Sequence, residues 1–137
     1  MDISDGGIPI SCIVTPASVH DSGASIPLQI MTKTRVNSLY VLADKAYDAQ
    51  QIRAHIRETG SVPIIPYNER RSGEAKHLEL FEKERFKERS TAERANSCLK
   101  DRLGAKNFHY KGFAKVSCHL MFGVLVMFTQ AVARLTQ

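Results

Sequence analysis

The stretch LYVLADKAYD at residues 39–48 contains the strongest strand signal of the chain, followed by the start of a helix. Its first five residues are apolar, without polar alternation, which predicts a strand over residues 39–44 that is buried on both faces of a sheet. Residues 49–58 then show a helical pattern, which we expect Asp48 to cap and Gly60 to end. Asp44 closes the strand at the end where parallel sheets bind ligands. Its position also fits an aspartate with only a turn or capping role.

Shorter signals upstream extend this pattern. Residues 8–14 are rich in β-branched side chains and follow Asp5-Gly6-Gly7, which predicts a strand entered through a hairpin turn from a strand ending near Ile3. His20-Asp21-Ser22 offers a helix cap, and the apolar spacing that follows predicts a helix over residues 26–36. Residues 62–66 contain two prolines and predict an edge strand.

The second half of the chain is predicted to be helical. Residues 67–76 are polar and predict a mobile loop, after which a long helix runs from about residue 78 or 81 to residue 103, where Gly104 ends it. Residues 106–112 form a connector to a final apolar helix over residues 113–135. This order is typical of an α/β fold whose middle strands are parallel, within a single domain over residues 1–137.

The net charge of the 137 residues is +5, and it is concentrated in one region. Residues 69–115 contain 13 Lys or Arg against 8 Asp or Glu, whereas the remainder is neutral. Charges that alternate in sign are typical of a solvated helical face, but the excess of cations after Arg94 favours a polyanionic partner. Both interpretations stay open on the charges alone.

The cysteines and the apolar runs bear on the cellular location. Cys12, Cys98 and Cys118 form no CxxC pair, so neither a disulfide framework nor a zinc site is predicted. The N-terminus lacks the pattern of a secretory signal. Residues 120–128 are apolar but shorter than a membrane span, so we expect a buried helix, a cytoplasmic protein and no membrane partner.

One group of residues in the long predicted helix has a spacing that suggests chemistry. Phe86, Arg89, Glu93 and Lys100 fall within about 60° of one another on an uninterrupted α-helix, at the margin of its apolar face. A carboxylate between two cations could bind a metal ion while the cations bind phosphates. The alternative is an ordinary ion pair between Arg89 and Glu93, four residues apart.

A resemblance to a known family favours the first interpretation. The spacing from Phe86 to Lys100 is similar to the Y-(2)-R-(3)-E-(6)-K signature of DDE-type transposases of bacterial insertion sequences. The region around that family's second catalytic aspartate resembles residues 41–56, VLADKAYDAQQIRAHI. Residues 6–22 resemble the strand-turn-strand region before it, and residues 111–127 resemble the family's closing helix.

The resemblance implies a fold and an activity. The fold would be RNase H-like, an α/β mixed sheet with flanking helices. The activity would be metal-dependent DNA cleavage and strand transfer with two Mg²⁺ ions, held by Asp44 as the second carboxylate and Glu93 as the third. Arg89 and Lys100 would bind DNA phosphates, and Phe86 stands where the family usually has Tyr. The implied partners are the transposon ends, the target DNA and a second copy of the chain in a synaptic complex.

The resemblance also implies that one part of the family's domain is missing. The family's first catalytic aspartate lies on a strand upstream of the region that matches residues 1–3, so we expect an N-terminally truncated domain that lacks its first strand. Asp2, Asp5 and Asp21 match other positions, and the five histidines show no ligand spacing. We therefore expect no activity from this chain alone. Two alternatives stay open: a non-catalytic DNA-binding remnant of a transposase, and a basic α/β interaction domain without a nucleic-acid role.

Overall fold

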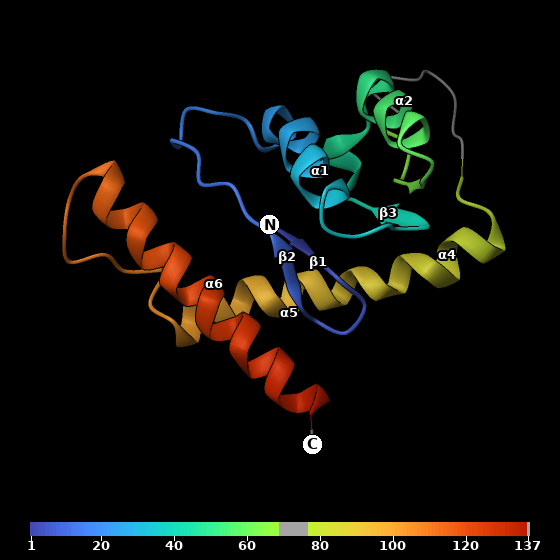
Figure 1. Cartoon of the computed structure of the whole chain (residues 1–137). Coiled ribbons are helices and arrows are strands. Elements are labelled where there is room, and N and C mark those ends of the chain that lie inside the picture. Colours follow the sequence, from blue (N-terminus) through green and yellow to red (C-terminus); the bar gives the residue numbers. More distant parts are fainter. Residues whose placement is uncertain (69–76, 137) are drawn as a thin grey trace. The chain divides into compact units, whose positions relative to one another are not determined.

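The computed structural model describes residues 1–68 and 77–136 (Figure 1). Its contacts group the chain into two compact units, one formed by His20–Arg89 and the other by Met1–Val19 together with Ser90–Gln137. Of the loop predicted over residues 67–76, the part from residue 69 onward lies outside the described residues. Both units combine helices with a small sheet, so the α/β character is confirmed.

The His20–Arg89 unit contains a parallel pair of strands. Strand β3 (Tyr40–Leu42) pairs with β4 (Val62–Ile64), and helix α2 (Gln50–Glu58) lies between them in the chain. The predicted parallel arrangement is therefore confirmed. The expectation that β3 is buried on both faces is wrong, because all three of its residues are only half-buried. The physical reason is that β3 has a single neighbour, β4, in the sheet of the described residues.

The core of this unit forms between α2 and the end of β4. Ile52, Ile56 and Ile65 are buried together there, because the two α2 isoleucines lie one helical turn apart and face the strand. Gly60 ends α2 as predicted, with a φ of +82° that side-chain-bearing residues rarely adopt.

Two helices precede β3 in this unit. The 3₁₀ turn η1 (Asp21–Ala24) begins at His20, whose ring accepts a hydrogen bond from the backbone N–H of Ser22 at 3.3 Å. The predicted cap is thus confirmed. Helix α1 (Ser25–Lys33) follows and ends earlier than the predicted residue 36.

The charged helix of this unit is interrupted. Helix α4 (Leu80–Phe86) starts with reciprocal hydrogen bonds between Glu79 and Glu82, in which each backbone N–H pairs with the other side chain. It gives way to the 3₁₀ turn η3 (Lys87–Arg89). The prediction of one uninterrupted helix to residue 103 is therefore wrong, because a 3₁₀ turn winds more tightly than an α-helix and changes the angle between successive side chains.

The other unit begins with the predicted hairpin. Strand β1 (Asp2–Ile3) pairs antiparallel with β2 (Pro9–Ser11). Gly7 in the turn has a φ of +75° and donates its N–H to the Ser4 carbonyl at 2.9 Å. The hairpin is confirmed, although β2 is shorter than the predicted strand over residues 8–14.

A helical segment continues this unit after the hairpin. Helix α5 (Ser90–Ser97) passes into the π-helical turn η4 (Cys98–Arg102), and Gly104 ends it as predicted with a φ of +75°. The connector is fixed to the next helix through His119, whose Nε2 lies 3.0 Å from the Leu103 carbonyl oxygen. The His119 ring also packs edge-on against Phe108 and beside Tyr110.

Helix α6 (Phe113–Leu135) has the predicted bounds but not the predicted burial. Its only buried positions are Gly123, Met127 and Ala131, which are spaced by four residues and form one narrow stripe. Large apolar side chains such as Phe122 and Leu125 are exposed among the described residues. The expected buried helix is wrong because a single stripe suffices to pack α6 onto η4 and β2 of its unit. By length and composition alone, α6 could also cross a membrane, a criterion that core helices of soluble proteins pass too.

Candidate active site

Asp44 lies at the C-terminal end of β3, where the sequence predicts it. It is the residue immediately before the 3₁₀ turn η2 (Lys45–Tyr47), and its Oδ1 accepts the backbone N–H of Lys45 at 2.6 Å. The carboxylate is held by the backbone but remains half exposed, with 52% of its side chain accessible. It therefore combines a fixed orientation with access from solvent.

Arg89 is the charged neighbour of Asp44 in the same unit. Its Nη1 lies 3.2 Å from Oδ2 of Asp44, and 28% of its side chain is exposed. The guanidinium also lies over the ring of Phe86, with Cζ 5.3 Å from the ring centre. The structure thus brings together three residues that the sequence singled out, Asp44, Phe86 and Arg89, although 42 positions separate the first two.

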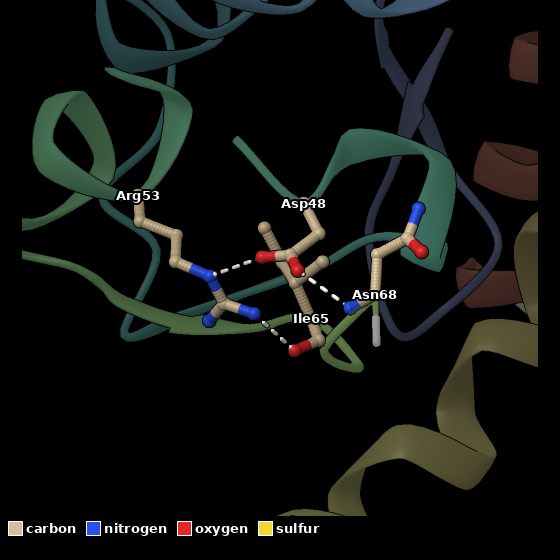
Figure 2. A network of polar contacts seen from close by, with 4 residues as sticks. All are labelled: Asp48, Arg53, Ile65 and Asn68. Atoms are coloured by element: carbon tan, nitrogen blue, oxygen red, sulfur yellow. Dashed lines mark hydrogen bonds and ion pairs between the residues drawn. The ribbon is translucent and has the colours of Figure 1, made fainter. Parts of the chain in front are cut away.

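Asp48 does not cap α2 as predicted. Residue Ala49 precedes the helix and makes no side-chain cap, whereas the Asp48 carboxylate points into the unit (Figure 2). Its Oδ1 accepts Arg53 Nε at 2.7 Å, and its Oδ2 accepts the backbone N–H of Asn68 at 2.6 Å. The cap is lost because a buried guanidinium five residues away attracts the carboxylate more strongly than the helix terminus does.

Arg53 extends this network to the strand. Its Nη2 donates to the carbonyl oxygen of Ile65 at 2.6 Å, and its Cζ lies 4.3 Å from the centre of the Tyr67 ring. The network ties the turn after Asp44 to the chain that leaves β4 (Figure 2). The network was not predicted from the sequence, although one signal was present: Arg53 directly follows Ile52, an apolar position of α2.

Glu93 and Lys100 belong to the other unit. Glu93 lies in the first turn of α5 and Lys100 in η4, and both are exposed. The predicted position at the margin of a buried face holds for Arg89, which is half-buried, and is wrong for Glu93 and Lys100. The breaks at η3 and η4 also remove the basis for placing all four residues on one helical face. A common metal site of Asp44 and Glu93 stays a prediction.

The described residues meet the requirements of a Mg²⁺ site only in part. Asp44 and Glu93 offer the hard oxygen ligands that Mg²⁺ prefers. Among residues 1–68 and 77–136, however, no three His, Cys, Asp or Glu side chains gather where they could hold a metal ion. Asp48 is turned away from solvent: its side chain is 90% buried and bound to Arg53 and the backbone of Asn68. The ligand type fits, but the number of ligands does not.

A comparison with protein families shows the family to which the chain belongs. A family model described as a transposase DDE domain matches residues 4–128, most of the chain. The chain therefore belongs to the DDE transposase family. This family generally uses divalent metal ions, and its partner is DNA. The comparisons with curated proteins and with solved structures gave no match.

Proposed function

We propose that this chain takes part in DNA transposition and supplies two of the carboxylates used in metal-dependent cleavage and strand transfer of DNA. Asp44 and Glu93 serve as metal-binding carboxylates, and Arg89 and Lys100 bind DNA phosphates. The observation that carries the proposal is the position of Asp44 at the C-terminal end of a parallel strand, within the region that matches the transposase DDE domain.

The strand pairings support an RNase H-like fold as part of this proposal. An antiparallel hairpin, β1 with β2, is followed by the parallel pair of β3 and β4 with α2 between them. A mixed sheet contains both kinds of pairing. The two small sheets therefore have the character expected of parts of such a fold.

The chemistry of phosphodiester cleavage explains why these residue types would be used. A pair of divalent ions activates the attacking oxygen and stabilises the leaving oxygen. The chain's own contribution is to orient and to bind. Lys45 N–H holds the Asp44 carboxylate in place, and the planar guanidinium of Arg89 matches a phosphate as well as it matches a carboxylate.

The proposed partners are the transposon ends, target DNA and a second copy of the chain in a synaptic complex, and the proposed location is the cytoplasm. The cationic excess over residues 69–115 supports binding to a polyanion. The three free cysteines agree with a reducing compartment.

A second candidate is a non-catalytic DNA-binding remnant of a transposase. The observation in its favour is that no group of three metal-binding side chains forms among the described residues. Two carboxylates hold a pair of divalent ions poorly, whereas DNA binding by Arg89 and Lys100 needs no metal. The remnant would therefore keep the affinity for DNA without the chemistry.

Titration with Mn²⁺, followed by electron paramagnetic resonance, separates the two candidates. If Asp44 and Glu93 share a site, Asp44→Asn and Glu93→Gln each weaken Mn²⁺ binding, and the double variant weakens it little further. Glu84→Gln, which removes an exposed carboxylate on α4, serves as the control and leaves the binding unchanged. Independent effects of the two substitutions, or no effect, would favour the remnant.

Incubation with supercoiled DNA and Mg²⁺ or Mn²⁺ tests competence. We expect no measurable nicking by the chain alone, because two carboxylates are too few. Nicking that both Asp44→Asn and Glu93→Gln abolish would show that a further residue, such as Asp2 or Asp5, completes the site, and would exclude the remnant.

A further inference from the structure

Asp44 forms an ion pair with Arg89, and in this pair it competes with DNA phosphates for the Arg89 guanidinium. Arg89 Nη1 lies 3.2 Å from Asp44 Oδ2, within a single compact unit. A guanidinium binds carboxylates and phosphates through the same N–H groups. A phosphate oxygen must therefore displace the Asp44 carboxylate before it can bind Arg89 Nη1.

We infer that Asp44 masks Arg89 and thereby lowers the affinity of this chain for DNA. The inference rests on the proposed role of Arg89 in binding phosphates and adds a role for Asp44 that is separate from cleavage. Whatever neutralises or occupies Oδ2 of Asp44 releases Arg89 Nη1 from this ion pair and strengthens DNA binding. By linkage, DNA strengthens the binding of that same group by the same factor.

The exposure of the pair makes the exchange feasible. The side chains of Asp44 and Arg89 are 52% and 28% exposed, so opening their ion pair costs little free energy. Oδ1 of Asp44 stays bound to Lys45 N–H when Oδ2 is released. The turn therefore keeps its conformation while Arg89 changes partner. The ring of Phe86 supports the guanidinium from one side in either case.

A role of Asp44 in orienting Arg89 toward DNA would change the DNA affinity in the opposite direction when Asp44 is replaced. If Asp44 instead oriented Arg89 toward DNA, the loss of the carboxylate would leave the guanidinium less ordered and would weaken DNA binding. A mask that is removed strengthens the binding. The direction of the change in affinity on substitution of Asp44 therefore decides between the two roles.

The test is fluorescence anisotropy with a labelled DNA duplex of arbitrary sequence, at low salt and in EDTA. Asp44→Asn keeps a side-chain oxygen for Lys45 N–H but removes the charge that holds Arg89. We expect it to bind the duplex about two- to fivefold more tightly than the wild type, the factor that corresponds to an ion pair of this exposure.

Two controls isolate the mask from the change in net charge. Glu84→Gln makes the same charge change on α4 and breaks the ion pair between Glu84 and Lys87, whose side chains are both more than 70% exposed. We expect it to increase the DNA affinity less than Asp44→Asn does. In an Arg89→Gln background, Asp44→Asn strengthens DNA binding no more than Glu84→Gln does, because only the change in net charge remains.

The outcomes separate this inference from the proposed function. If the wild type binds DNA but Asp44→Asn binds no more tightly than Glu84→Gln, Asp44 does not mask Arg89, whereas the proposal that the chain binds DNA is retained. If the gain from Asp44→Asn is as large in the Arg89→Gln background as in the wild type, the mask is overturned in the same way. If no variant binds DNA, the proposed function fails together with the mask.

Discussion

Arg53 Nε lies 2.7 Å from Oδ1 of Asp48, and the side chains of both residues are 90% buried. Both partners make further hydrogen bonds: the second carboxylate oxygen accepts Asn68 N–H, and the guanidinium donates to the Ile65 carbonyl. A buried charge whose hydrogen bonds are all made is tolerated, whereas one that loses its partner is not. This relationship fixes the turn that follows Asp44 to the end of β4.

Replacing Arg53 should destabilise the chain strongly. Arg53→Ala leaves the Asp48 carboxylate buried without its cation, which should lower the free energy of unfolding by about 3 to 5 kcal/mol. Urea denaturation followed by circular dichroism measures the change. Lys87→Ala, which breaks the exposed pair with Glu84, is the control and should cost less than about 1 kcal/mol. Equal effects of the two substitutions would show that the buried pair does not form.

DNA binding should depend on salt and hardly on sequence. Lys100→Gln removes a cation from the basic region and should weaken binding to unrelated duplexes by a similar factor, with the slope of log affinity against log salt falling by about one. Anisotropy titrations at several salt concentrations measure this slope. Lys33→Gln, on α1 outside residues 69–115, is the matched control. If only substitutions outside residues 69–115 abolished DNA binding, the prediction would be contradicted.

Adjacent residues of α6 should differ sharply in their contribution to stability. Met127 is 7% exposed and Phe128 is 42% exposed. Met127→Ala removes buried side-chain volume and should cost about 2 to 5 kcal/mol, while Phe128→Ala should cost far less. Thermal or urea unfolding of the two variants tests this, and a larger loss for Phe128→Ala would mean that α6 buries a different face.

The local elements were predictable because their signals are local. Gly60 and Gly104 end helical segments with positive φ, and the hairpin turn uses Gly7 in the same way. The parallel pairing of β3 with β4 follows from the helix that connects them. Each of these features depends on a few neighbouring residues, whose preferences can be read without knowing the rest of the fold.

The errors concern features that depend on tertiary contacts. A cap at Asp48 satisfies the local rule, but the Arg53 guanidinium takes the carboxylate instead. Alternating charges gave no sign of the break at η3, since a 3₁₀ turn of three residues is too short to change the pattern visibly. The apolar composition of α6 indicated a helix correctly, but burial depends on which faces find a neighbour.

The candidate site was predictable in part. Asp44, Phe86 and Arg89 were singled out from position and spacing, and they lie together in one unit. That Arg89 pairs with Asp44, 45 positions earlier in the chain, could not be foreseen. Helical spacing predicts only the neighbours of a residue on its own helix, whereas Asp44 comes from a strand.

The distance between Asp44 and Glu93 is the most direct test of whether the two carboxylates share a metal pair. Nitroxide labels on cysteines at both positions, in a chain whose Cys12, Cys98 and Cys118 are replaced by Ser, report that distance by electron paramagnetic resonance. A shared metal pair requires carboxylates within about 4 to 8 Å of each other, so we expect strong dipolar broadening. A spectrum equal to the sum of the two singly labelled spectra would contradict the claim.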